Sequence, residues 1–190
     1  MGLDPGKRPD VELVAAGWAG CMALPRTLSL SADGDLEMSV APEAQSLREK
    51  AYSLSPKSSA HDSEIFQNIA IDGLRAELQW KSASTNLTLA LEDRSGAWWS
   101  SVLRTGSYTT TVTVNGVAFE VPATPADGPD FHLFLDGSVA ELIIDRRHAI
   151  TSRMYRQPNG ALRVKLGADS KVASLNAWAM RPISPDRLTT

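Results

Sequence analysis

The sequence predicts an all-β protein, a two-layer antiparallel β-sandwich of jelly-roll or concanavalin-like type, preceded by an N-terminal hairpin and a short helical linker. Two observations predict this fold class. Short segments that alternate apolar and polar residues fill most of the chain, and turn residues separate them at intervals of about 8–12 residues. Helical periodicity is scarce and is clearest at 42–52, the expected linker. With 190 residues, of which 43% are apolar, the chain can form one such domain and an appendage.

Eleven segments have the length and composition of β-strands. They are residues 64–71, 74–81, 86–93, 97–104, 107–114, 117–121, 131–136, 138–145, 149–156, 162–166 and 171–180. Turn dipeptides such as Asn115-Gly116 lie between several of them, and both residue types tolerate the positive φ of a tight hairpin. In residues 109–114 the valines point to one face and the alternate threonines to the other, which is typical of a sheet with one buried face.

The N-terminal part has a different pattern. Residues 28–40 predict a hairpin that turns at Gly34. An isolated hairpin is only marginally stable in water, so we expect this one to lie against another surface. The chain is therefore divided into a disordered or extended N-terminus, a hairpin and linker, the sandwich, and a tail, at residues 1–16, 17–52, 53–182 and 183–190.

Composition excludes several classes of function. The net charge of −3 provides no basic surface for nucleic acid or an anionic membrane, and the apolar runs are shorter than the roughly 20 residues of a membrane span. The N-terminus has no apolar signal segment, which makes cytoplasmic localisation the default expectation. Cys21 is the only cysteine, and His61, His132 and His148 lack metal-ligand spacing, so neither a metal nor another cofactor is expected.

Acidic residues gather in FLDGSVAELIID (134–145), where Asp136 and Glu141 are candidates for general acid–base catalysis. On a strand, Glu141 shares its face with apolar residues, and an unpaired carboxylate there would be costly. Arg153 of the following strand is the expected partner of Glu141. Asp136 precedes Gly137, where an aspartate commonly accepts backbone hydrogen bonds of a turn. We therefore predict a structural ion pair and a turn residue, with catalysis as the alternative.

Trp98 and Trp99 are the candidate ligand-binding residues. Adjacent residues of a strand point to opposite faces, so one tryptophan is expected in the core and the other at the surface. An exposed indole can stack on the apolar face of a sugar, or it can seal an interface between domains. Both interpretations remain open from the sequence.

Two stretches resemble a known family. GWAGCMALPRTLSLSADGDLEMSVAPEAQSLR (17–48) resembles the segment that closes the catalytic domain of family-32 glycoside hydrolases, the invertase and β-fructofuranosidase family. The resemblance is carried by Gly-Trp-x-Gly, Leu-Pro-Arg at 24–26, the Asp-Gly turn and the ending Pro-x-x-x-x-Leu-Arg. FHLFLDGSVAELIIDRRHAITSRMY (131–155) and LNAWAM (175–180) resemble motifs of that family's C-terminal sandwich.

In that family the chemistry belongs to a propeller that precedes these stretches. Its motifs Trp-x-Asn-Asp-Pro, Arg-Asp-Pro and Glu-Cys do not occur here. The resemblance therefore implies a non-catalytic C-terminal module without catalytic residues, a structural or accessory domain that is inactive alone. Its expected partner is a propeller-bearing glycosidase chain, or a second copy bound through residues 17–40. Two alternatives stay open: a lectin-like module that binds fructosides, and a self-sufficient hydrolase that uses Asp136 and Glu141.

Overall fold

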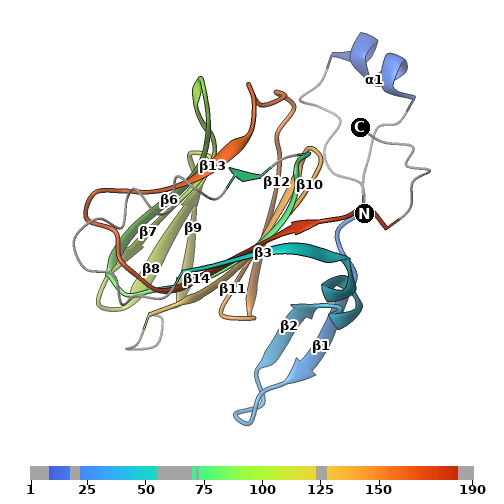
Figure 1. Ribbon diagram of the computed structural model, residues 1–190. Coiled ribbons are helices and arrows are strands. Elements are labelled where there is room, and N and C mark those ends of the chain that lie inside the picture. Colours follow the sequence, from blue (N-terminus) through green and yellow to red (C-terminus); the bar gives the residue numbers. More distant parts are fainter. Residues whose placement is uncertain (1–8, 18–21, 55–69, 72, 123–127, 184–190) are drawn as a thin grey trace.

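The computed structural model describes residues 9–17, 22–54, 70–71, 73–122 and 128–183. Two antiparallel six-stranded sheets face each other (Figure 1), which confirms the predicted β-sandwich. The first sheet has the strand order β12-β11-β10-β5-β14-β3, and the second has the order β4-β13-β6-β7-β8-β9.

Apart from Arg48–Leu54, the strands of the two sheets lie where the alternating segments of the sequence predicted them. Those of the first sheet are β3 (Arg48–Leu54), β5 (Arg75–Ser82), β10 (Asp130–Asp136), β11 (Val139–Ile144), β12 (His148–Arg153) and β14 (Val172–Met180). Those of the second are β4 (Ala70–Ile71), β6 (Asn86–Asp93), β7 (Gly96–Thr105), β8 (Thr109–Val114), β9 (Val117–Pro122) and β13 (Leu162–Leu166). Of the predicted strand at 64–71, only the two residues of β4 lie within the described residues.

The core fills the space between the two sheets. Leu78 and Leu133 of the first sheet and Leu89 of the second are fully buried. Trp80 stacks on Phe131 of the neighbouring strand, with ring centroids 4.9 Å apart. Because inward residues alternate with outward ones along each strand, the same strands present a second set of side chains to the outside of the sandwich.

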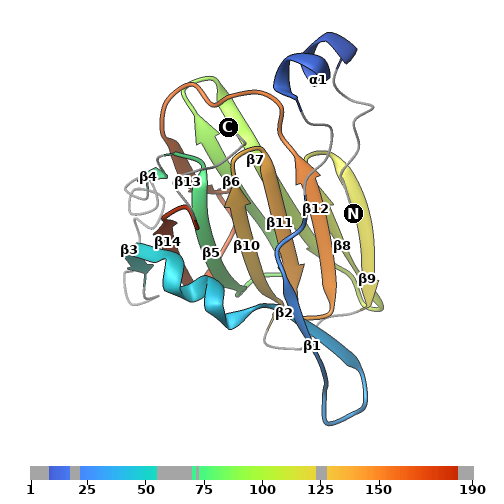
Figure 2. The same cartoon turned by 90° about the vertical axis from the view of Figure 1, so that its right-hand side faces the viewer.

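The N-terminal hairpin consists of β1 (Arg26–Leu30) and β2 (Leu36–Val40). It lies on the outer face of the first sheet, over one end of β10, β11 and β12, and its tip projects beyond the sheet (Figure 2). An apolar cluster of Val40, Phe134 and Ile143 joins the two, and the Met38 amide donates a 2.6 Å hydrogen bond to the Arg146 carbonyl. The hairpin therefore packs against the sandwich, as expected because an isolated hairpin is only marginally stable in water.

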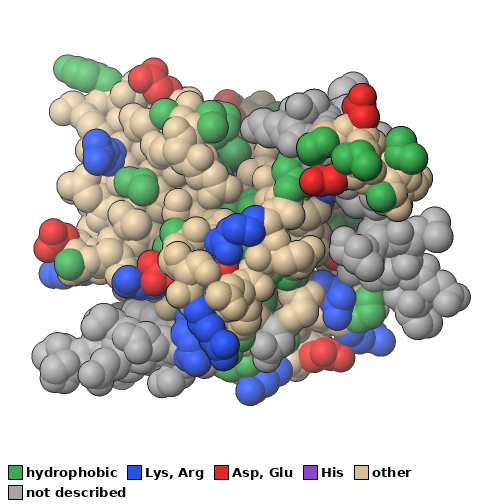
Figure 3. Space-filling model, turned by 90° about the horizontal axis from the view of Figure 1, so that it is seen from above, with side chains coloured by type: hydrophobic (Ala, Val, Ile, Leu, Met, Phe, Trp, Pro, Cys, Tyr) green, Lys and Arg blue, Asp and Glu red, His purple; other side chains and the backbone are tan. Residues whose placement is uncertain are grey.

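Two parts of the chain differ from the predicted local structure. The helix expected over 42–52 is a 3₁₀ helix that ends at Leu47, and Arg48–Leu54 is strand β3, because its backbone pairs with the edge of β14. Asp10–Ala16 is an α-helix, α1, within the segment expected to be disordered or extended. Gly17 ends α1 with a φ of 72° and donates its amide to Leu13 and Val14. Apolar side chains of α1 lie at the surface (Figure 3).

No helix among the described residues is long and apolar enough to cross a membrane.

Candidate functional site

The outer face of the first sheet carries two buried carboxylates in one row. Phe134 of β10 lies opposite Glu77 of β5 on one side and opposite Glu141 of β11 on the other. Glu77 is 1% exposed and Glu141 is 3% exposed. With strands spaced about 4.8 Å apart, the two acids lie about 10 Å from each other across the Phe134 ring.

Glu141 is held by the root of the hairpin. Its Oε2 accepts a hydrogen bond from Arg26 Nη2 at 2.8 Å, and its Oε1 accepts one from the Leu24 amide at 2.6 Å. The buried acid has the charged partner that it requires, but Arg26 is a residue that the sequence did not suggest. Arg153 of β12 lies opposite Val139 of β11, and the guanidinium carbon of Arg153 is 5.2 Å from the centroid of the Tyr155 ring.

Glu77 is the centre of a polar network that sequence reasoning missed. Arg48 Nε donates to its Oε2 at 2.6 Å, while His132 Nε2 and Gln79 Nε2 lie 2.7 and 3.2 Å from its Oε1. The Arg48 guanidinium also lies 3.9 Å from the centre of the Trp178 ring. Burial raises the pKa of Glu77, but the hydrogen bonds and positive charge of Arg48 and His132 outweigh it and hold the pKa below its usual value. The carboxylate stays ionised and fixes these side chains.

Asp136 and Glu141 do not form a catalytic pair of open carboxylates. Asp136 is exposed at the end of β10, and the neighbouring Gly137 adopts a φ of 60° and donates its amide to the Leu74 carbonyl at 2.9 Å. Glu141 is nearly inaccessible, and each of its oxygens already accepts a hydrogen bond. A general acid or base must reach its substrate, and Glu141 has no open side from which to do so.

The expectation that Trp98 or Trp99 is exposed is wrong. A β-bulge in the pairing with β6 makes Trp98 an extra residue, since Trp99 lies opposite Leu91 and the next pair joins Ala97 to Glu92. The strand therefore turns both indoles into the core, where they are 6% and 1% exposed. Trp98 Nε1 donates to the Arg156 carbonyl at 2.6 Å, so neither ring offers a flat surface to a sugar.

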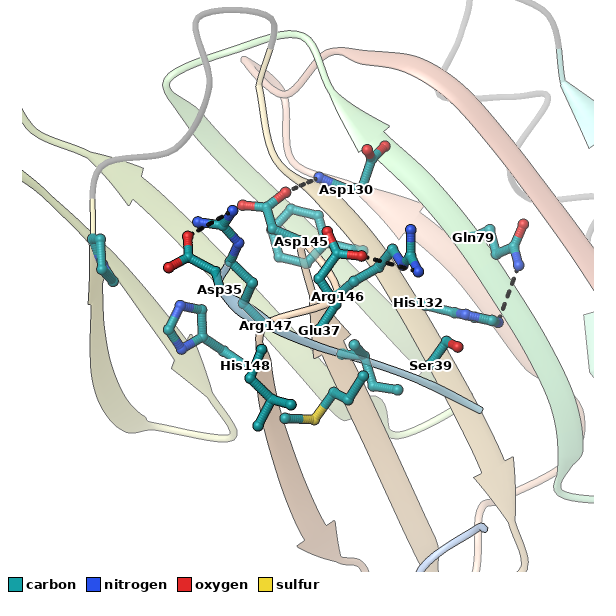
Figure 4. A pocket seen from close by; sticks show the side chains of 15 residues that line it. Asp35, Glu37, Ser39, Gln79, Asp130, His132, Asp145, Arg146, Arg147 and His148 are labelled. Atoms are coloured by element: carbon teal, nitrogen blue, oxygen red, sulfur yellow. Dashed lines mark hydrogen bonds and ion pairs between the residues drawn. The ribbon is translucent and has the colours of Figure 1, made fainter. Parts of the chain in front are cut away.

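Beside the buried acids lies an open polar groove of about 1040 Å³. Strand β2 and the turn between β11 and β12, which contact each other, both line it, and Gln79 and His132 lie at one end of the groove (Figure 4). Asp145, in that turn, has its pKa raised by burial, although it accepts a hydrogen bond from the Asp130 amide. The described residues hold no group of three or more His, Cys, Asp or Glu side chains suited to a metal ion, and Cys21 and His61 lie outside them.

Comparisons with known proteins agree with this architecture. No protein-family model matches the chain. A sucrose-6-phosphate hydrolase of Escherichia coli is 28% identical in an alignment of 176 residues that covers 86% of this chain and 35% of that protein. The chain thus spans about a third of the length of this curated relative.

Solved structures share the fold. A sucrose-6-phosphate hydrolase of Lactobacillus gasseri is 21% identical with a TM-score of 0.65, over 88% of this chain and 35% of that one. A fructan 1-exohydrolase of Cichorium intybus is 15% identical with a TM-score of 0.64, over 91% and 43%. A family-32 β-fructofuranosidase of Bombyx mori is 23% identical with a TM-score of 0.61, over 93% and 36%. These comparisons confirm the predicted resemblance of this chain to the C-terminal β-sandwich module of family-32 glycoside hydrolases.

Proposed function

We propose that this chain is an accessory module that docks through its β1–β2 hairpin on a propeller-bearing glycosidase of this family and does not hydrolyse fructosides by itself. The observation that carries the proposal is the half-covered apolar face of the hairpin. Its role is then to stabilise the catalytic domain rather than to supply catalytic groups.

The two ends of the hairpin differ in how far they are covered. At its root, Val40 is buried and Met38 packs against the cluster on the first sheet. At its tip, Leu28, Leu30 and Leu36 are 65%, 72% and 54% exposed. Leu28 pairs with Met38 and Leu30 with Leu36, so the apolar face continues from the root past the edge of the sandwich.

The hairpin also offers a strand edge. Within the described part of the chain, β1 pairs with β2 and with no other strand. An unpaired edge next to exposed leucines is a template for a further strand, and exposed apolar patches mark protein interfaces. A propeller, which is built of small sheets, can supply such a strand.

The hydrogen bonding of the two buried carboxylates supports inactivity of the isolated chain. Both oxygens of Glu141 accept hydrogen bonds from the hairpin root, and Glu77 is saturated by Arg48 and His132. The catalytic motifs of the family are absent from the sequence. We expect no turnover of sucrose, sucrose 6-phosphate or a short fructan by the purified wild-type chain or by its Asp136→Asn and Glu141→Gln variants. Turnover that both variants abolish while they remain folded would contradict the proposal.

Docking is tested by producing the chain together with the catalytic part of the E. coli relative and isolating the complex. We expect Leu28→Ser with Leu30→Ser to prevent the complex without lowering the stability of the chain, because both side chains are exposed. Val117→Ser is the matched control, since Val117 is 55% exposed on β9 of the second sheet. Equal loss in the control, or a homodimer through the leucines in place of the complex, would count against the proposal.

A further inference from the structure

We infer that strand β9 is a self-association edge, through which two copies of this chain pair about a two-fold axis at Phe119. β9 is the last strand of the second sheet, and within the described residues it pairs with β8 alone (Figure 2). The inference does not rest on the proposed function, because the hairpin lies on the outer face of the first sheet.

The neighbouring strands identify the backbone groups of β9 that face outward. The Asn115 amide donates to the Ser100 carbonyl of β7 at 3.0 Å, so the odd-numbered residues of β8 bond to β7 and the even-numbered ones to β9. Phe119 lies opposite an even-numbered residue of β8, which means that the amides and carbonyls of Ala118 and Glu120 point away from the sheet. Both residues are exposed, so a further strand can reach them.

The side chains of β9 that point into the sandwich are apolar but incompletely covered. Val117, Phe119 and Val121 lie opposite inward-facing residues of β8. Val121 is 5% exposed, whereas Phe119 is 37% and Val117 is 55% exposed. The core therefore covers one end of β9 and leaves the other open, and exposed apolar surface of this kind marks protein interfaces.

A second copy of the chain complements this edge. With Phe119 on the two-fold axis, Ala118 of each copy lies opposite Glu120 of the other, and their outward amides and carbonyls bond to one another. On the apolar face, Phe119 meets Phe119 of the second copy, and Val117 meets Val121. The same pairing thus satisfies the free backbone groups and covers the open apolar side chains.

The neighbouring registers are less favourable. An axis at Glu120 would set two carboxylates opposite each other and would place Pro122, which has no amide, opposite Ala118. An axis at Ala118 would set Glu120 opposite Gly116, whose φ of 82° belongs to the β8–β9 turn. A two-fold pairing occupies the edge of both copies, so the assembly ends at two chains.

The test is sedimentation of the purified chain at concentrations from about 1 to 300 µM. A contact of one strand pair is small, so we expect a reversible dimer with a dissociation constant of about 10–100 µM. Phe119→Lys and Phe119→Glu each set like charges on the axis and should raise that constant by about tenfold or more, whereas a mixture of the two should form a mixed dimer. Leu30→Lys, at a position 72% exposed on the unpaired edge of β1, is the matched control and should leave the constant unchanged.

A disulfide tests the register. In a Cys21→Ser background, Phe119→Cys sets two thiols at a pair whose Cα atoms lie about 4.5 Å apart, which a disulfide can bridge. With oxidised glutathione as the oxidant, we expect this variant to form a covalent dimer. Ala118→Cys faces Glu120 of the second copy, so it should form one about tenfold more slowly.

Three results would overturn the inference. They are a wild-type chain that stays monomeric over this range, a dimer that Leu30→Lys weakens as much as Phe119→Lys does, and equal rates of disulfide formation at positions 118 and 119. If Phe119→Lys fails to fold, the wild-type sedimentation and the disulfide rates still decide. Dimer formation and formation of the glycosidase complex are separate measurements, so either proposal can fail alone.

Discussion

Replacing Arg26 by methionine should detach the hairpin from the sandwich, because Arg26 is the charged partner of a buried carboxylate. The side chain of Arg26 is 22% exposed and that of Glu141 is 4% exposed. Methionine keeps most of the apolar stem that packs beside the hairpin root but leaves Glu141 with the Leu24 amide as its remaining hydrogen bond. The ionised carboxylate is then buried without a counter-charge.

The size of the effect follows from this geometry. Removing one partner of a fully buried ion pair costs about 3–5 kcal/mol. The partial exposure of Arg26 and the bond that Leu24 retains reduce this, so we expect a loss of about 2–3 kcal/mol in the free energy of unfolding. For a domain of this size, such a loss lowers the melting temperature by roughly 5–10 °C.

The assay is urea unfolding at neutral pH of the wild type, Arg26→Met, Glu141→Gln and the double variant. Because the two residues interact directly, the double variant should lose less than the sum of the single losses. Lys165→Met is the matched control. Lys165 lies 3.1 Å from Glu92 with side chains 61% and 30% exposed, and its loss should cost less than about 1 kcal/mol.

Two outcomes would refute this reasoning. One is an Arg26→Met loss no greater than that of Lys165→Met, and the other is strict additivity in the double variant. Hydrogen exchange of the Met38 amide, which bonds to the Arg146 carbonyl across the contact, distinguishes local detachment of the hairpin from global unfolding.

Three further variants probe the rest of the sandwich. Glu77→Gln should lower the free energy of unfolding at pH 7 and make it less dependent on acid pH. The folded pKa of Glu77 lies below the ordinary 4.5, so its carboxylate stabilises the fold above pH 4.5 and loses that contribution as the pH falls through the folded pKa. Urea unfolding at a series of pH values measures this difference. Trp99→Ala should cost about 3–5 kcal/mol by urea unfolding, and a near-neutral result would mean that the residue is not in the core. In thermal unfolding, Gly128→Ala should be far more harmful than Gly137→Ala, because its Cβ would overlap the Ser82 carbonyl oxygen, whereas that of Gly137 meets nothing within 4 Å. Equal losses would show that positive φ alone sets the cost.

Much of the fold could be predicted because it depends on local patterns in the sequence. The alternation in 109–114 gives β8 with its valines inward, and Asn115-Gly116 gives the turn to β9 with φ of 49° and 82°. The prediction over 42–52 was wrong from Arg48 onward. That segment has helical periodicity by itself. In the folded chain its backbone pairs with β14 and its Arg48 side chain donates a hydrogen bond to Glu77, and both partners are distant in sequence.

The candidate site shows the same division. The sequence indicated that Glu141 needs a partner, since burying an unpaired carboxylate among apolar neighbours on a strand is energetically costly. It did not identify Arg26, which lies 115 residues earlier, because the place where the hairpin docks depends on surfaces that no local pattern records. Likewise the period of two assigns Trp98 and Trp99 to opposite faces, and the bulge opposite Leu91 overrides it.

By itself, the sequence determined the all-β class, the order of the strands along the chain, most of the turns, and the resemblance to a glycosidase module. All of these depend on residues that are neighbours in the chain or on motifs that can be read along it. Only the tertiary structure decided which carboxylates are neutralised, that both tryptophans are internal, and that a groove opens beside β2 and the β11–β12 turn. Those properties arise where a two-stranded hairpin meets a six-stranded sheet, and contacts between distant segments exist only once the chain is folded.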